Sequence, residues 1–454
     1  MPVPMLAHGI GGVRDLPVPT WLFFWGAAVV LVLSFLLLGT LWKRSQLERR
    51  AEGRPIPPAL ERVLRSTVLH VLLGAVSAGL LVLVFLTALL GEPSSATNLA
   101  PTFVYVVFWL GIVPLQVVLG NVWPALNPWL AIASAVAWVW RSLGRSWNPI
   151  VVYPERLGVY PAALLLFAFV ALELCYVDPA NPRALALAIA LYSYVTWIGM
   201  AAVGRRLWAE RGEAFTVYFG LLARIAPFGE RDGRIVARLP FSGLAGAERT
   251  PGMLAVVAVM LGSVGFDGLS RSSVWQDLRA RVEGPYVLDS PGVADLVGTL
   301  LALGGLAGCI AVVVVAYLAA TRLARRAAGG ERSLEPDFLQ SLVPIALVYA
   351  VAHYFTLLVV QGQFALPLAS DPFGFGWDLL GAADVAPNLA PFSPNTVWYV
   401  QVGALVTGHV AGLAVAHDRA VTLFSPRPAL RSQYALLALM VAYTVGGLWL
   451  LSQE

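Results

Sequence analysis

The chain has 454 residues, of which 58% are hydrophobic and only 12% are charged, and its formal net charge is +4. This composition excludes an ordinary soluble domain, in which roughly half of the residues are apolar and about a quarter are charged. Apolar stretches of about 20 residues, each long enough to cross the hydrocarbon core of a bilayer, recur along the sequence. They predict an all-α integral membrane protein with a single transmembrane domain over residues 1–454.

Ten apolar runs are candidate membrane-spanning helices. They lie near residues 19–42, 67–91, 101–120, 158–177, 184–203, 253–266, 296–321, 338–360, 396–416 and 432–451. Of the 30 Lys and Arg residues, 25 fall in alternate gaps between these runs. Because basic loops stay in the cytoplasm, this asymmetry predicts a multi-pass protein of the plasma membrane with its N-terminus and C-terminus outside.

Residues 121–140 are apolar enough for an eleventh span, but Pro124 and Pro128 interrupt them. An additional crossing would also invert every later loop and export most of the arginines. We therefore expect an interfacial or re-entrant helical hairpin at this segment.

The longest cytoplasmic gap, residues 204–251, contains two patterned stretches, GEAFTVYFGLLARIAPF and DGRIVARLPF. They predict an amphipathic helix and a small β-hairpin lying under the bilayer. On the outside, residues 362–395 form an extracytoplasmic loop with Asp371, Asp378 and Asp384 but no basic residue. This loop either caps a cavity or is a poorly structured connection.

Small residues recur every four positions in two spans and predict close helix packing there. In the ninth span they are Ala404, Gly408, Gly412 and Ala416, and in the seventh they are Gly304 and Gly308. Asp418 and Arg419 come after His417 at the end of the ninth span, and we expect these two residues to end the helix at the cytoplasmic surface.

Ionisable residues within spans are the first candidates for function, because a charge at the bilayer centre costs on the order of 2.5–3.5 kcal/mol on insertion scales. His353 lies in the eighth span, His409 in the ninth, Glu173 in the outer third of the fourth and Asp267 at the outer end of the sixth. We expect the polar faces of the eighth and ninth spans to meet, with Glu173 and Asp267 closing a chamber open to the outside. Arg271, one helical turn after Asp267, is placed to hold its charge.

Three interpretations of His353 and His409 are open: hydrogen-bonded packing residues, metal ligands or proton carriers, and axial ligands of a haem. A bis-histidine haem needs two imidazoles at matching depth. His353 lies about 12 Å and His409 about 20 Å from the outer ends of their helices, at about 1.5 Å per residue. Haem is therefore the least favoured of the three.

Several familiar chemistries are missing from the sequence. It contains no HExxH, His-x-His, GxSxG or Walker-type glycine motif, and no nucleic-acid-binding module. Cys175 and Cys309 both sit inside apolar runs, so neither a disulfide framework nor a thiolate metal cage is expected.

Eight segments distributed over nearly the whole chain point to a known family. They are HGIGGVRDLPVPTWLF (8–23), NVWPALNPW (121–129), YPERLG (153–158), FTVYFGLLARIAP (215–227), FDG (266–268), HYFTLLVVQGQ (353–363), SDPFGFGWDLLG (370–381) and PNTVWYVQVGALVTGHVAGLAVAHDRA (394–420). Together they resemble actinobacterial membrane proteins commonly labelled fenitrothion hydrolase. The resemblance implies hydrolysis of an apolar aryl phosphorothioate triester, which would reach a site in the outer half of the bilayer.

If the implied activity holds, His353 and His409 are expected to bind a divalent metal that activates a water, with Asp267 and Glu173 as the catalytic carboxylates. The rival hypothesis is a proton-coupled transporter of a small apolar molecule, in which the same histidines relay protons. A third is a scaffold subunit of a membrane complex. The expected partners are the lipid bilayer and, for the first two hypotheses, a small apolar substrate; the oligomeric state is not predicted.

Overall fold

The computed structural model describes residues 20–145 and 148–451, and its helices occupy the predicted spans. Within these residues, nine helical stretches are long and apolar enough to cross a membrane. The expectation of an all-α, multi-pass membrane protein is confirmed. The first predicted span coincides with α1 (Thr20–Leu41), whose predicted start at residue 19 lies outside the described residues.

Five of the nine stretches are single helices: α10 (Pro182–Val203), α13 (Met253–Arg271), α15 (Pro291–Ala328), α19 (Pro394–Leu423) and α20 (Pro426–Leu451). The other four are composite. They are α3 (Pro58–Leu64) with α4 (Thr67–Leu90); α5 (Leu99–Thr102) with η2 (Phe103–Leu110) and α6 (Ile112–Leu119); η3 (Glu155–Leu157) with α9 (Tyr160–Cys175); and α16 (Glu335–Phe338) with η6 (Leu339–Leu342), α17 (Val343–Thr356), η7 (Leu357–Gln361), η8 (Gly362–Phe364) and α18 (Ala365–Ser370).

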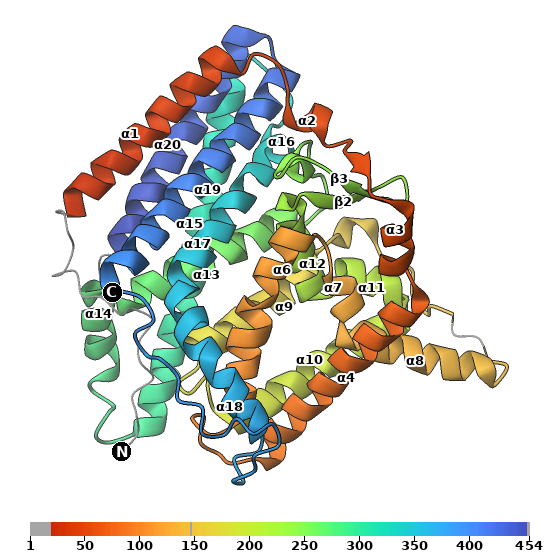
Figure 1. The fold of residues 1–454 in the computed structure, drawn as a ribbon. Helices are drawn as coiled ribbons and strands as arrows, with labels where there is room; N and C mark the ends of the chain where they lie inside the picture. The colour runs from red at the N-terminus through yellow and green to blue at the C-terminus, as the bar shows by residue number, and fades with distance from the viewer. Residues whose placement is uncertain (1–19, 146–147, 452–454) are drawn as a thin grey trace.

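The two ends of the bundle differ in what they carry. In Figure 1, α1 begins and α20 ends on the side of α14 (Ser273–Glu283) and α18, whereas α2 (Leu47–Arg50), α16 and the β-sheet lie at the other end. The arginine-rich loops belong to this second end, which we call the basic face; the other end is the opposite face. Many span side chains exposed on the outside of the bundle are apolar, including Val68, Leu72, Leu164 and Leu187, as contact with lipid requires.

The helices pack as two groups (Figure 1). In the first helix group, α4 packs against α8 (Pro128–Ser142) and α10, α10 against α11 (Arg205–Arg211), and α9 against α12 (Ala214–Leu222). In the second helix group, α13, α15, α17, α19 and α20 pack against one another and α1 packs against α19 and α20. The groups meet where α9 and α12 contact α13 and α17.

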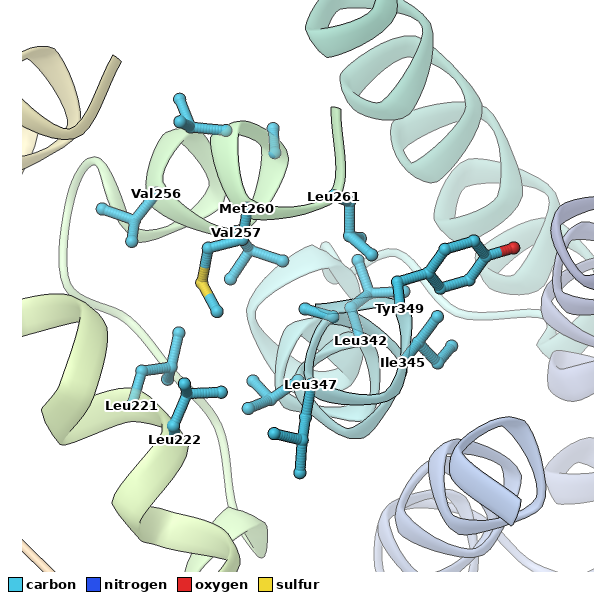
Figure 2. Close-up of a cluster of buried hydrophobic side chains, with 14 of the residues drawn as sticks. Leu221, Leu222, Val256, Val257, Met260, Leu261, Leu342, Ile345, Leu347 and Tyr349 are labelled. Carbon is cyan, nitrogen blue, oxygen red and sulfur yellow. The ribbon is translucent and has the colours of Figure 1, made fainter. Parts of the chain in front are cut away.

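An apolar core fills this junction. Figure 2 shows Leu221 and Leu222 of α12 facing Val257 and Met260 of α13 and Leu347 of α17. Because lipid is as apolar as these side chains, burial from water contributes little to helix association inside a bilayer. Close van der Waals packing has to hold the two groups together.

Two short helical hairpins, one after α6 and one after α10, pack against α10. The first re-entrant hairpin comprises α7 (Trp123–Leu126) and α8 (Pro128–Ser142), and Asn127 caps α8 by accepting a 2.9 Å hydrogen bond from the Leu130 amide. Trp129 Nε1 donates a 2.8 Å hydrogen bond to Ser193 Oγ, halfway along α10. Helix α8 has 15 residues and is not among the helices of the described residues that are long and apolar enough to cross a membrane, so the segment at 121–140 does not form another span.

The second re-entrant hairpin comprises α11 (Arg205–Arg211) and α12 (Ala214–Leu222). Helix α11 folds back along α10, with the Trp208 ring tightly against Gly199. Side chains are buried on almost every side of α12. This differs from the amphipathic surface helix expected within residues 204–251, because α11 returns the chain to the interior before α12 begins.

The β-hairpin prediction is confirmed. Strands β2 (Phe228–Arg231) and β3 (Arg234–Ala237) are antiparallel, and both residues of the connecting turn, Asp232 and Gly233, have positive φ angles of 48° and 72°. An Asp-Gly pair is typical of this two-residue turn. Strand β1 (Arg54–Pro55) pairs with β3, so that the strand order is β1-β3-β2.

Of the two predicted small-residue stripes, one is confirmed. A Cβ at Gly408 would lie 2.1 Å from a methyl of Val348 on α17, so α17 and α19 approach closely. The seventh-span prediction is wrong, since a Cβ at Gly304 or Gly308 would meet nothing within 4 Å. The close approach falls one residue away at Gly305, because the Trp275 ring of α14 packs there.

Candidate functional site

Asp267 and His353, both predicted as site residues, lie in contact where α13 packs against α17. His353 Nε2 is 2.6 Å from Asp267 Oδ2, and Arg271 Nη2 is 2.8 Å from Asp267 Oδ1. Asp267 is 4% exposed and His353 is 3% exposed. The carboxylate is thus shared between a guanidinium one turn further along its own helix and an imidazole of a neighbouring helix, with the imidazole Nε2–H as donor.

Glu173, the third predicted site residue, reaches the same region from α9 in the first helix group. Its carboxyl interacts electrostatically with Asp267, His353 and Arg271. Within the described residues, the Glu173 carboxyl has no hydrogen-bond partner. It borders a small internal cavity between the two helix groups.

The cavity is lined by aromatic and aliphatic side chains around Glu173. Trp109 of η2 and Tyr218 of α12 come from the first helix group, and Tyr354 of α17 comes from the second. Trp109 stacks on Tyr218 with ring centroids 4.6 Å apart, and Tyr354 also interacts with the Asp267 carboxyl. The space open to the centre of a water molecule is about 20 Å³, which exceeds the roughly 10–15 Å³ that one water needs.

Two π-helical segments flank the site. The first, η2, carries Trp109, and the second, η7, begins three residues after Tyr354. They contact each other, and a Cβ at Gly362, the residue after η7, would lie 3.9 Å from a methyl of Val106 in η2. π-Helical turns are rare and occur frequently at functional sites, because the extra residue per turn redirects side chains and frees backbone groups. Here η2 contributes Trp109 and Leu110 to the lining of the cavity, and η7 packs against η2 beside it.

His409 has different neighbours from His353. Its Nδ1 lies 2.8 Å from the Leu405 carbonyl oxygen, which identifies Nδ1 as the protonated nitrogen, and its ring packs edge-on against Tyr349 with centroids 5.7 Å apart. Its Nε2 is buried and has no hydrogen-bond partner among residues 20–145 and 148–451. In the described part of the chain, no group of three or more His, Cys, Asp and Glu side chains is arranged to hold a metal ion. A metal shared by His353 and His409 stays a prediction.

The polar faces of the eighth and ninth spans do meet, as expected. Gln401 Nε2 of α19 donates a 2.8 Å hydrogen bond to the Ala352 carbonyl oxygen of α17. Gln401, His409 and His417 recur at multiples of four residues and form one polar stripe on α19. His417 has partners elsewhere, since its Nε2 lies 2.9 Å from the Trp42 carbonyl oxygen and its Nδ1 3.1 Å from Gln433 Oε1. The stripe on α19 therefore serves two separate regions.

Asp418 and Arg419 do not end α19, which continues to Leu423. The Asp418 carboxylate is 1% exposed and accepts hydrogen bonds from five donors of the segment that follows α1. They are Trp42 Nε1 at 2.9 Å, Ser45 Oγ at 2.8 Å and the backbone amides of Gln46, Leu47 and Glu48 at 2.5, 3.1 and 3.1 Å. The expected helix end is instead a joint between α19 and the start of α2.

The loop predicted over residues 362–395 begins later than expected, because η8 and α18 continue the helical stretch to Ser370, and the remainder is held by hydrogen bonds. Asp371 accepts hydrogen bonds from the amides of Phe375 and Gly376 at 3.0 and 2.7 Å. Hydrogen bonds from Ser370, at 2.5 Å, and from nearby backbone amides lower the pKa of Asp378. None of the residues that line the cavity belongs to the 371–393 segment of this loop.

Sequence reasoning misses Glu213, which is fully buried at the start of α12. Its carboxylate accepts hydrogen bonds from three elements, and the donors are Tyr192 Oη, Phe215 N at 2.9 Å, Thr216 N at 2.8 Å, Thr216 Oγ1 at 2.5 Å, Asn127 Nδ2 at 3.0 Å and Trp123 Nε1 at 3.3 Å. Glu213 therefore joins the two re-entrant hairpins beside the middle of α10. The available signal was an acidic residue immediately before an apolar helix, which is an N-cap position.

No family model, curated protein or solved structure matches the chain. A functional assignment for this protein therefore has to rest on the geometry of the site.

Proposed function

We propose that the protein is a proton-coupled transporter of a small apolar molecule in the plasma membrane, and that Asp267 and His353 form its proton-binding site. The observation that carries the proposal is the buried carboxylate shared between His353 and Arg271. Ionisable groups inside membrane-spanning helices are costly and are retained where ions or protons move. Histidine is suited to this role because its ordinary pKa is about 6.5.

The position of the site supports coupling between a proton and a change of shape. Asp267, Arg271 and His353 belong to the second helix group, whereas Glu173 belongs to the first. With the imidazole neutral, the charges of Asp267 and Arg271 cancel; a proton on His353 adds one positive charge beside Glu173. Protonation therefore changes the attraction between the two groups, which is the differential interaction that a conformational shift requires.

The size of the cavity suits a proton site. Its space of about 20 Å³ accommodates one or two waters, so water can lie beside Glu173, next to the element that carries His353. A scaffold role gives no reason to bury an imidazole and two carboxylates side by side.

The test uses purified protein in proteoliposomes with a pH-sensitive dye inside and fenitrothion as the apolar probe. We expect the probe to trigger proton movement, and His353→Gln to reduce the rate at least tenfold. The matched control is His70→Gln, because His70 is an exposed histidine near the basic face. Release of the nitrophenol product, read by absorbance and abolished in His353→Gln, would favour the hydrolase instead. Equal proton movement in the His353→Gln and wild-type proteins would refute the proton site.

A further inference from the structure

Gln116 of α6 is a buried amide without partners. The residue is 0% exposed, and neither its Oε1 nor its Nε2 has a hydrogen-bond partner among the described residues. A buried polar group left unpaired is destabilising, and an amide has both a donor and an acceptor to satisfy. An apolar residue would stabilise this position better, so packing does not account for the glutamine.

The place of Gln116 along α6 is informative. Leu110, the last residue of η2, lines the Glu173 cavity, and Gly120, immediately after α6, lies against the Phe228 carbonyl oxygen of β2 at the basic face. At about 1.5 Å per residue, Gln116 is about 9 Å from the level of Leu110 and about 6 Å from that of Gly120. Gln116 therefore lies between the cavity and the basic face.

The buried face of α6 carries Val113 and Gln116 and packs against α12 and η4 (Ala223–Ile225). At the cavity end of this interface, Trp109 Nε1 is also buried without a partner, and the Trp109 ring stacks on Tyr218 of α12. At the other end of the interface, α12 carries Gly220, which is partly exposed. A Cβ added at Gly220 would lie 3.9 Å from the side-chain amide of Asn121, which is exposed. Along this interface, from the cavity to the basic face, lie Trp109 Nε1 and the Gln116 amide, which are buried without partners in the described ranges, and then the exposed amide of Asn121.

We propose that the interface between α6 and α12 is a hydrated proton path from the basic face to the Glu173 cavity, and that Gln116 holds its central water. The inference rests on the proposed function, to which it adds the route by which protons reach the site. Gln116 Oε1 accepts a hydrogen bond from the water and Gln116 Nε2 donates one. The amide itself gains and loses no proton: each water accepts a proton on one side and releases one on the other, so that one proton enters and one leaves.

Accessibility to water tests the path directly. In a background with Cys175→Ala and Cys309→Ala, Gln116→Cys is exposed to a charged, membrane-impermeant methanethiosulfonate reagent from each side of oriented proteoliposomes. We expect labelling from the basic face at least tenfold faster than from the opposite face. Gly220→Cys is the positive control. Val257→Cys is the matched negative control, because Val257 is 0% exposed, lies four residues inside α13 as Gln116 lies four residues before Gly120, and belongs to the apolar cluster drawn in Figure 2.

A second variant separates a path from a structural role. Gln116→Leu removes the unpaired amide, so we expect a melting temperature equal to or above that of the wild type together with at least a tenfold slower proton movement. A structural glutamine would instead give a lower melting temperature. Labelling of Gln116→Cys no faster than that of Val257→Cys, or unchanged proton movement in Gln116→Leu, would overturn the path. If wild-type protein moves no protons, the proposed function fails, while the labelling still decides whether water reaches Gln116.

Discussion

The carboxylate of Glu213 is expected to be one of the largest single contributors to stability in the first helix group. Its Oε2 atom accepts hydrogen bonds from Trp123, Asn127 and Thr216, and its Oε1 atom accepts from Tyr192 and the Phe215 amide. At a net of about 1 kcal/mol for each of the six bonds, Glu213→Ala should cost about 4–6 kcal/mol. That is a large part of the roughly 5–15 kcal/mol that stabilises a typical fold.

Smaller changes at the same place give a graded series. Glu213→Gln keeps the acceptor at the Oε2 position and replaces the other oxygen with an amide group, so the Tyr192 hydroxyl and the Phe215 amide both lose their acceptor and we expect a cost of about 2 kcal/mol. Tyr192→Phe removes one hydroxyl and should cost about 1 kcal/mol. The control is Glu210→Gln, an exposed carboxylate on α11, for which we expect no change.

Thermal unfolding of detergent-purified protein measures this order, with size-exclusion chromatography of heated samples as the readout. The double variant Tyr192→Phe with Glu213→Gln should cost less than the sum of the single variants, because both remove the same hydrogen bond. If Glu213→Ala melts at the temperature of Glu210→Gln, the hydrogen bonds of Glu213 do not hold the two re-entrant hairpins together.

Three other sites should respond to substitution, each measured by thermal unfolding. Gly408→Ala should destabilise the protein, because its Cβ would collide with α17. The control Gly304→Ala, whose Cβ meets nothing within 4 Å, should be neutral or stabilising by up to about 1 kcal/mol. Equal changes in melting temperature for the two variants would contradict the close packing at Gly408. Asp418→Ala should cost about 3–5 kcal/mol, since five donors lose their acceptor; a melting temperature equal to that of the wild type would refute the joint. Burial raises the pKa of Glu248, but hydrogen bonds from Thr250 and the charge of Arg224 outweigh it and lower that pKa below 4.5. The stability that Glu248 contributes is present above pH 4.5 and is lost as the pH falls through the folded-state pKa. Glu248→Gln should therefore reduce the loss of stability in acid.

Features that depend on local pattern could be predicted from the sequence. The apolar runs identify the spans because every crossing needs about 20 apolar residues. The Asp232-Gly233 pair identifies the hairpin turn because both positions need a positive φ angle. The spacing of Asp267 and Arg271 predicts their ion pair because residues four apart lie on one face of a helix.

Features that depend on how helices rotate and pack could not. The close contact of α15 lies at Gly305 and not at Gly304 because Trp275 of α14 selects the face, and a spacing of four does not say which face. The separate surroundings of His353 and His409 also depend on tertiary packing. Glu213 lies in a segment expected at the membrane surface, and hydrophobic periodicity does not indicate that a carboxylate there is buried and hydrogen-bonded to several helices.

The distance in sequence between strands β1 and β3 limits how early the three-stranded sheet can form during synthesis. Strand β1 leaves the ribosome about 180 residues before its partner β3. At roughly 5–20 residues per second, the two are separated by about 10–40 s of synthesis. During that interval the spans from α4 to α10 are inserted, while the edge of β1 waits unpaired. The sheet can therefore form only after half of the protein has been synthesised and inserted. It stabilises the first helix group after that group has entered the membrane and does not nucleate its assembly.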